Sequence, residues 1–278
     1  MGFTPSKADF DLWMRPKGDH YEYVATYVDD ILAFSKDPMS IIEEIRQDYV
    51  LKGVGQPEYY LGGHYHATKD IDSVSEVDHD IKGNHLSSEW LKEGIKTAFS
   101  AKTYVEQSLG KLEQMTEVES FATYNSSMPD GAHPELDDST MLNYIEHSKL
   151  CNLIGCANWL VTLGRFDIAY AVNAFSRFSM APRQGHLQGI IRVFKYLKKW
   201  DKGTIMIDAK YPDHAQFDVA DYDQWKEFYP DVEEMLPGPT EMPDPMGPRA
   251  RFTVYADSDH IHAVLTRRSV TGILCNMR

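Results

Sequence analysis

Two adjacent carboxylates, Asp29 and Asp30, are the side chains of this sequence best suited to chemistry. They close the tetrapeptide Tyr-Val-Asp-Asp that begins at Tyr27. Neighbouring carboxylates repel one another unless a cation lies between them, and Mg²⁺ or Mn²⁺ with oxygen ligands meets that demand. A pair of such ions promotes phosphoryl transfer by stabilising the attacking and leaving oxygens. The alternative is a solvated turn, because Asp is common in turns.

The segments around this pair predict a β-hairpin that carries the carboxylates at its turn. Residues 21–26 and 31–35 are short runs of aromatic and β-branched residues, which favour strands. Behind them, residues 39–51 place apolar side chains at helical spacing and are followed by Gly53, so a helix is predicted there.

Further along, the pattern predicts a mixture of strands and helices. A strand interrupted by two glycines is expected at 58–66, and the helix at 141–163 is apolar on most faces, so we expect it to be buried. The other expected elements are helices at 90–112, 167–180 and 186–200 and strands at 252–257 and 269–275.

Charge is distributed unevenly. The chain has 278 residues and a net charge of −14, which argues against nucleic-acid binding by its whole surface. Residues 165–202, however, contain eight Lys or Arg against two acids, a local charge of about +6. Residues 209–248 contain ten acids, two lysines and seven prolines, which predicts an extended linker or insertion.

The cysteines do not indicate a disulfide framework or a zinc site. Cys151, Cys156 and Cys275 are an odd number without a C-x-x-C pair, so we expect small core residues. No apolar run is long enough to cross a bilayer, and the first residues lack the apolar stretch of a signal peptide. An intracellular protein with no membrane partner is therefore expected.

Six segments follow one another along most of the chain in an order that is typical of one family. They are GFTPSKAD at 2–9, YVDDIL at 27–32, YYLG at 59–62, RFDIAYAV at 165–172, RVFKYLK at 192–198, and YADSD at 255–259 with RRSVTG at 267–272. This series resembles the reverse transcriptase and RNase H region of a copia-type (Pseudoviridae-like) LTR retrotransposon Pol polyprotein.

The resemblance implies an α+β fold. It implies a partial polymerase palm, an antiparallel sheet with helices, over 1–115, and thumb or connection helices over 116–208. The acidic, proline-rich linker or insertion then covers 209–250, and an incomplete RNase H-like start covers 251–278.

The same resemblance implies an RNA-directed DNA polymerase that uses two-metal nucleotidyl transfer. Asp29 and Asp30 would bind Mg²⁺ or Mn²⁺, and Asp257 would belong to the RNase H site. Tyr59, Tyr60, Leu61 and Gly62 would support the primer end. Cations of the helical region would hold an RNA or DNA primer–template weakly and without reading sequence; the candidates are Arg177, Arg183, Arg192, Lys195, Lys198 and Lys199. Solvated helix faces, and for Asp257 an acidic strand end, are the alternatives.

Departures from the family pattern limit the expected activity. The family has a third metal-binding aspartate and nucleotide-closing fingers before the segment that this chain begins with, and RNase H carboxylates after the segment it ends with. We therefore expect the chain alone to be inactive, with dNTP binding only if the missing palm is supplied. A non-catalytic nucleic-acid-binding remnant or a non-functional relic are the alternatives. Family resemblance implies a location in cytoplasmic virus-like particles or the nucleus.

Overall fold

The protein consists of two compact units, each with its own strands and helices. The computed structural model describes residues 1–55, 57–68, 96–116, 123–207, 252–258 and 263–277, with isolated positions between 227 and 246. The first unit comprises Met1–Lys52, Lys210–Thr253 and Asn276–Arg278, and the second comprises Gly53–Ala209 and Val254–Cys275. Most of the linker expected at 209–250 lies outside the described residues.

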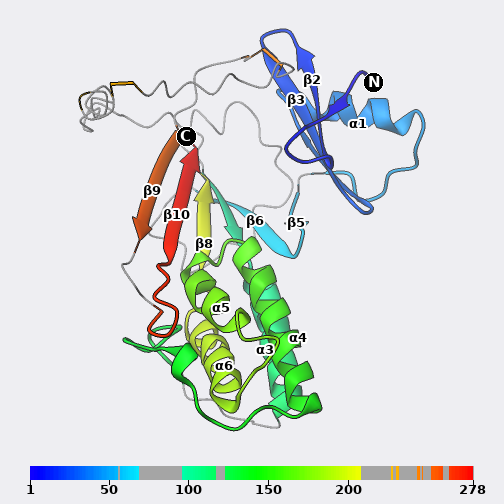
Figure 1. Cartoon of the computed structure of the whole chain (residues 1–278). Coiled ribbons are helices and arrows are strands. Elements are labelled where there is room, and N and C mark those ends of the chain that lie inside the picture. Colours follow the sequence, from blue (N-terminus) through cyan, green and yellow to red (C-terminus); the bar gives the residue numbers. More distant parts are fainter. Residues whose placement is uncertain are drawn as a thin grey trace. The chain divides into compact units, whose positions relative to one another are not determined.

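The first unit contains an antiparallel sheet with one helix against it (Figure 1). Its elements are β1 (Thr4–Pro5), β2 (Leu12–Lys17), β3 (His20–Tyr27), β4 (Asp30–Phe34) and α1 (Pro38–Arg46). The strands pair in chain order, and Val24, Ile41 and Ile45 form a small core between sheet and helix. The hairpin predicted around the two carboxylates is confirmed, because β3 and β4 pair antiparallel with Tyr27 opposite Asp30.

Helix α1 is shorter than predicted. It begins after Asp37, whose carboxylate accepts the Ser40 N–H at 3.3 Å, and it ends at Arg46. The prediction that it continues to Leu51 is wrong, because Tyr49 is 68% exposed and no buried apolar side chain extends the helical face. Side-chain burial on one face supplies most of a short helix's stability.

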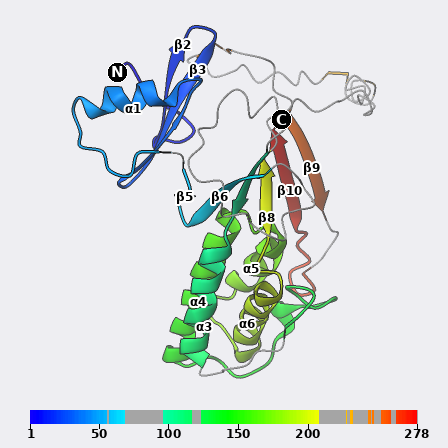
Figure 2. The ribbon, with the colours of Figure 1, turned by 180° about the vertical axis from the view of Figure 1, so that it is seen from behind.

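The second unit combines a helical bundle with an antiparallel sheet. Its helices are α3 (Lys102–Thr116), α4 (Tyr144–Thr162), α5 (Ala169–Ser176) and α6 (Gln184–Lys199), with short 3₁₀ turns η1 (Pro134–Leu136) and η2 (Phe166–Ile168). The sheet has the order β5 (Tyr59–Tyr60), β6 (Gly63–Thr68), β7 (Lys96–Ser100) and β8 (Thr204–Ile207). Seen from behind in Figure 2, β6 and β8 extend from one end of the bundle.

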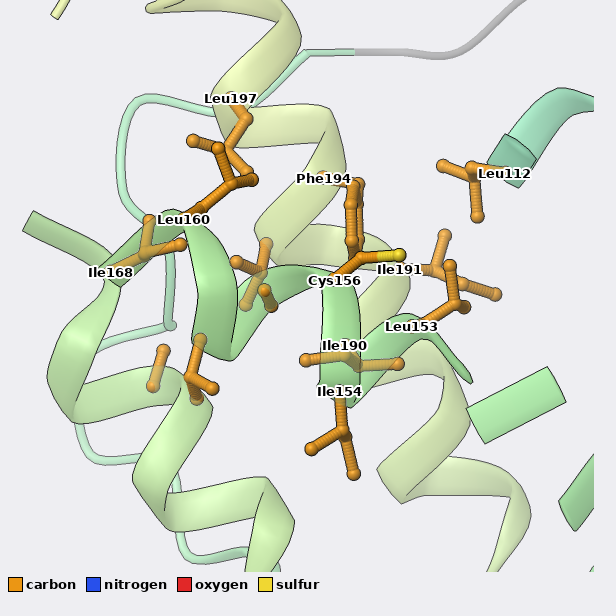
Figure 3. Packing of buried hydrophobic residues seen from close by; sticks show 14 of the residues in the cluster. Leu112, Leu153, Ile154, Cys156, Leu160, Ile168, Ile190, Ile191, Phe194 and Leu197 are labelled. Carbon is orange, nitrogen blue, oxygen red and sulfur yellow. The ribbon is translucent and has the colours of Figure 1, made fainter. Parts of the chain in front are cut away.

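The bundle is held by a continuous apolar core (Figure 3). Buried side chains of α4 recur at helical spacing, so the prediction of a buried helix is confirmed; they are Leu150, Leu153, Ile154, Cys156, Ala157 and Leu160. From α6, Ile190, Phe194 and Leu197 are fully buried against them. The cysteines differ from expectation, because Cys156 is buried but Cys151 and Cys275 are exposed.

Three other predictions need correction. The prediction of a helix over 90–112 is wrong for the first described residues of that range. Lys96–Ser100 forms β7 there, and α3 begins only at Lys102. Pairing of β7 with β6 and β8 overrides the local pattern. The single interrupted strand at 58–66 is a hairpin, and the helix expected at 167–180 is η2 followed by α5.

A separate two-stranded sheet is formed by β9 (Phe252–Ser258) and β10 (Thr271–Met277), which run in opposite directions (Figure 1). These strands confirm the two predicted near the C-terminus. Helix α3 packs with α4 and α6 in the second unit, and the domain bounds implied by the resemblance stay predictions. Within the described residues, no helix is long and apolar enough to span a bilayer.

Candidate metal site and nucleic-acid interface

The two carboxylates lie at the tip of the β3–β4 hairpin. Val28 and Asp29 form its two-residue turn, and Asp30 begins β4. Both aspartates are exposed, so an ion can approach them from solvent. The hairpin thus presents two carboxylates from adjacent residues, and oxygen donors of this kind are what Mg²⁺ and Mn²⁺ prefer.

The backbone of this turn is strained. Val28 has φ = 55°, in the left-handed region, and is 94% exposed. A β-branched side chain is rarely found there because its Cβ meets the backbone. Such strain persists only where surrounding structure enforces it, and it is commonly found at functional sites. Here the pairing of β3 with β4 enforces a tight turn beside the carboxylates.

The described residues do not complete a metal site. Among them, no group of three or more His, Cys, Asp or Glu side chains is placed to hold an ion. Asp29 and Asp30 therefore fit Mg²⁺ or Mn²⁺ chemically but supply only part of the six or so ligands that such an ion takes.

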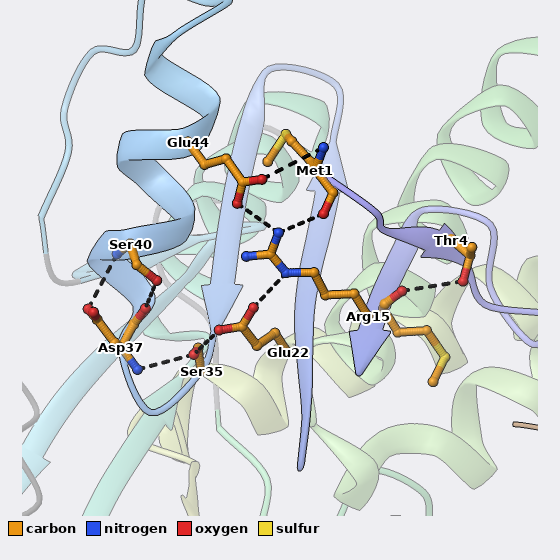
Figure 4. Close-up of polar contacts among 9 residues, drawn as sticks. Met1, Thr4, Arg15, Glu22, Ser35, Asp37, Ser40 and Glu44 are labelled. Carbon is orange, nitrogen blue, oxygen red and sulfur yellow. Dashed lines mark hydrogen bonds and ion pairs between the residues drawn. The ribbon is translucent and has the colours of Figure 1, made fainter. Parts of the chain in front are cut away.

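A buried ion-pair network supports β3, the first strand of this hairpin (Figure 4). Glu22 is 1% exposed, and its carboxylate accepts Arg15 Nε–H at 2.6 Å and the Ser35 hydroxyl at 2.8 Å. Arg15 also donates to Glu44 at 2.7 Å, which joins α1 to the sheet. Burial alone would raise the pKa of Glu22, but the hydrogen bonds from Arg15 and Ser35 hold it below its usual value.

The segment expected to support a primer end forms a second tight hairpin, in the other unit. Leu61 (φ = 54°) and Gly62 (φ = 90°) connect β5 and β6, and Tyr60 pairs with Gly63. Two consecutive positive φ values favour glycine, so Leu61 is strained. Leu61 packs against the bundle core, and the rings of Tyr59 and His64 form an edge-to-face pair with centroids 5.0 Å apart.

Three of the six expected backbone-binding cations share one stripe of α6. Arg192, Lys195 and Lys199 are spaced three and four residues apart, which places them on one helical face. Tyr124 lies against that face, with its ring centroid 3.9 Å from the Arg192 guanidinium carbon and 6.0 Å from Lys195 Nζ. Trp200 lies 5.5 Å from Lys199 Nζ. The stripe thus combines cations with aromatic rings, as in surfaces that bind nucleic-acid strands.

The other three candidates lie elsewhere in the second unit. Lys198 points toward α3 and pairs with Glu113 at 3.4 Å. Arg183 caps α6 at its start and donates to the Ser139 carbonyl, and Arg177 is exposed at the end of α5. The structure therefore brings together only part of the basic block.

Arg165, which contributes to the local positive charge, is not on the surface. It is 3% exposed and donates two hydrogen bonds to Asp167, at 2.9 and 2.7 Å. Sequence reasoning missed this pair, and it also missed Tyr124. The spacing of Arg165 and Asp167 was visible, but their burial depends on packing against distant residues.

Asp257 is exposed on β9, and Asp259 lies outside the described residues. Gly272 of β10 lies across from it, because a Cβ built there would be 3.9 Å from the Asp257 carbonyl oxygen. Within the described part of the chain, Asp257 does not belong to any group of three or more His, Cys, Asp or Glu side chains that could hold a metal ion. The RNase H assignment of Asp257 stays a prediction.

Two curated proteins are similar to 71% of this chain. A putative transposon Ty5-1 protein of Saccharomyces cerevisiae is 28% identical over 201 residues, and the retrovirus-related Pol polyprotein from transposon RE1 of Arabidopsis thaliana is 24% identical over 200 residues. The chain spans 55% of the first protein and 12% of the second. No family model and no solved structure matches. These similarities support a protein derived from a retrotransposon Pol polyprotein.

Proposed function

We propose that this chain forms part of a copia-type retrotransposon reverse transcriptase, an RNA-directed DNA polymerase. The observation that carries the proposal is the β3–β4 hairpin, whose strained two-residue turn presents Asp29 and Asp30 to solvent. The sheet of the first unit would be palm, and the bundle of the second would be thumb and connection. The similarity to Pol proteins supports this assignment.

In this function, Asp29 and Asp30 would hold one face of a Mg²⁺ or Mn²⁺ ion. A bound ion would neutralise charge on the nucleotide phosphates during transfer. The protein's own contribution is to fix both carboxylates on a rigid hairpin, which the Arg15–Glu22 pair supports from β3. Further ligands would have to come from the substrate, water or another polypeptide segment.

We expect the hairpin to bind Mn²⁺ weakly, with a dissociation constant of about 10⁻³ M, because two carboxylates are an incomplete ligand set. Paramagnetic broadening of the backbone amide signals of residues 28–31 would measure it. Asp29→Asn with Asp30→Asn is expected to abolish the broadening, since the amides keep the shape but lose the charge. Asp9→Asn with Asp11→Asn is the matched control, because this pair is also exposed and lies near a turn. Equal broadening in both double variants would remove the metal assignment.

The basic stripe of α6 would contact the primer–template. Lys and Arg bind phosphates without reading sequence, and each phosphate neutralised releases counterions, so affinity falls as salt rises. Cation–π contacts with Tyr124 and Trp200 hold Arg192 and Lys199 on this face. The net charge of −14 does not oppose local binding, because screening limits charge effects to about 8–10 Å at physiological salt.

Changing Arg192, Lys195, Lys198 and Lys199 together to alanine is expected to weaken primer–template binding about tenfold or more at low salt. The slope of log affinity against log salt should fall by about 0.9 for each phosphate that the variant no longer neutralises. Fluorescence anisotropy with a labelled duplex measures both quantities.

A matched control changes Lys7, Lys17, Lys36 and Lys52 to alanine. These four lysines are exposed and lie in the first unit, so net charge changes equally. If both quadruple variants lose the same affinity, binding reflects total charge and the α6 interface is wrong.

A second candidate is a nucleic-acid-binding remnant without catalysis. It is favoured by the contrast between a formed basic stripe and a metal site that the described residues leave incomplete. Primer extension by this chain joined to a copia-type palm segment separates the two functions. Extension abolished by Asp30→Ala supports the polymerase, and extension unchanged by it supports the remnant.

A further inference from the structure

A groove of about 360 Å³ lies between α6 and the segment that precedes α4. Its volume falls within the range typical of small-ligand sites. Its walls combine apolar, cationic and acidic side chains. Those that carry the argument are Tyr124, Pro134, Asp137, Phe175, Arg192 and Lys195.

One end of the groove is cationic. Arg192 stacks on Tyr124 and donates from Nη2 to the Ser126 hydroxyl at 3.3 Å. Its Nε is buried and has no hydrogen-bond partner within the described part of the chain. A buried donor without a partner is costly, so this geometry favours an acceptor from outside the described residues. Lys195 lines the same end and adds a second positive charge.

The other end is lined by the carboxylate of Asp137. One oxygen of Asp137 accepts the Ser139 N–H at 3.0 Å, and the other, Oδ2, is buried without a hydrogen-bond partner among the described residues. His186 Nε2 lies 3.8 Å from Oδ2, too far for a hydrogen bond. Burial would raise the pKa of Asp137, but the hydrogen bond from the Ser139 N–H and the nearby Arg183 guanidinium hold it below its usual value, so the group is ionised at neutral pH.

The position of Asp137 is built into the helix. A Cβ on Gly185 would lie 2.4 Å from Oδ2, so a larger residue at 185 would displace the carboxylate. Pro134 and Phe175 add apolar surface to the groove lining. A Cβ on Gly189 would lie 2.2 Å from the Phe175 ring, so this glycine lets Phe175 approach α6.

These features define a ligand with an anion at one end, a flat apolar body, and N–H donors at the other. Arg192 follows Gly185 by seven residues, which is about 10 Å along the helix axis. That span is comparable to the reach of a nucleotide from its 5′-phosphate to the far edge of its base.

We propose that this groove binds a nucleoside 5′-phosphate unit, with the phosphate at Arg192 and Lys195 and a guanine edge at Asp137. Guanine suits the carboxylate because its N1–H and N2–H groups are adjacent donors. The unit can be a free mononucleotide or an unpaired nucleotide of a strand. The site shares Arg192 and Lys195 with the proposed primer–template interface but does not depend on it.

Isothermal titration of the whole chain with GMP, AMP, UMP and inorganic phosphate tests the groove. GMP is expected to bind most tightly and inorganic phosphate most weakly. Asp137→Asn should weaken GMP binding about tenfold or more, because guanine loses hydrogen bonds to a charged acceptor. The same variant should lower the affinity for GMP to the affinity for AMP, because the amide places a donor against the donors of guanine.

A second variant keeps the test valid if Asp137→Asn fails to fold. Ala132→Phe adds bulk to the groove lining and is expected to reduce GMP binding to the level of inorganic phosphate, with an unchanged melting temperature. Lys199→Ala is the control on the same helix, because Lys199 does not line the groove; it should weaken duplex binding and leave GMP binding intact. This contrast separates failure of the groove from failure of the primer–template interface.

Two results would overturn the proposal: GMP binding no tighter than inorganic phosphate, or GMP binding that survives both Asp137→Asn and Ala132→Phe. A duplex with one unpaired guanosine, compared with its blunt counterpart, identifies the source of the ligand. Tighter binding of the overhang that is lost in Ala132→Phe assigns the groove to a strand, and equal binding assigns it to a free nucleotide.

Discussion

Arg15→Met is expected to lower the free energy of unfolding of the first unit by about 3–5 kcal/mol, the cost of removing one partner from a buried ion pair. Arg15 is 12% exposed and Glu22 is 2% exposed in their side chains, and they meet at 2.6 Å. Methionine fills a similar volume but leaves the Glu22 carboxylate buried with only the Ser35 hydroxyl as a donor. Urea unfolding followed by circular dichroism measures the change.

A double variant distinguishes a lost attraction from an unpaired charge. Arg15→Met with Glu22→Gln should recover most of the stability lost in the single variant, because no buried charge is left. Lys36→Ala is the control, since Lys36 and Asp19 form a pair that is 67% and 81% exposed. Removal of such a solvent-exposed pair should leave stability nearly unchanged. If Arg15→Met unfolds at the same urea concentration as the wild type, the expected effect is contradicted.

The same pair predicts a pH dependence. Because Arg15 and Ser35 hold the pKa of Glu22 below its usual value, the stability they add is present above that usual value and is lost as pH falls through the lowered pKa. In Arg15→Met, burial without a cation raises the pKa of Glu22 instead. The stability difference between wild type and variant should therefore shrink between pH 7 and about pH 4.

The sequence was sufficient for elements whose signal is local. The β3–β4 hairpin follows from two strand-like runs separated by a short acidic turn, and α4 and α6 follow from apolar side chains at helical spacing. The resemblance to Pol proteins rests on the same local segments and is supported by two curated relatives. The local pattern alone thus placed Asp29 and Asp30 correctly at a turn.

Features set by distant contacts were not predictable in this way. Strand β7 was expected to be helical, because its strand character depends on β6 and on β8, which lies about a hundred residues later. No sequence pattern pointed to Asp137. Its proposed role depends on its contact with Gly185 and on a buried carboxylate oxygen that has no hydrogen-bond partner among the described residues. Arg165 was counted only in the local positive charge, and its burial, which makes it part of the structural framework of the bundle, could not be read from the sequence.

Asp167→Ala is expected to destabilise the second unit by about 3 kcal/mol, because it leaves the Arg165 guanidinium buried without its carboxylate. The side chain of Arg165 is 4% exposed, and its Nη1 already lacks a hydrogen-bond partner among the described residues. Asp167 is 37% exposed, so water can replace part of its contribution, which places the cost at the low end of the range for buried pairs.

The loss should extend beyond the pair itself. Burial and the nearby Asp167 carboxylate raise the pKa of Tyr196, so this carboxylate lies beside α6, the helix that carries the basic stripe. A Cβ on Gly203 would lie 2.8 Å from Arg165 Nε, which shows how closely the chain entering β8 covers the guanidinium. Water therefore has little access from that side.

Thermal and urea unfolding of three variants test this role. Arg165→Met with Asp167→Ala should be more stable than Asp167→Ala alone, because the unpaired cation is gone. Asp130→Ala is the matched control, since it removes an exposed acid of the same unit and should change stability by no more than about 0.5 kcal/mol. If Asp167→Ala instead unfolds like the wild type while primer–template affinity falls, Asp167 acts at the nucleic-acid surface and not in the framework that positions α6.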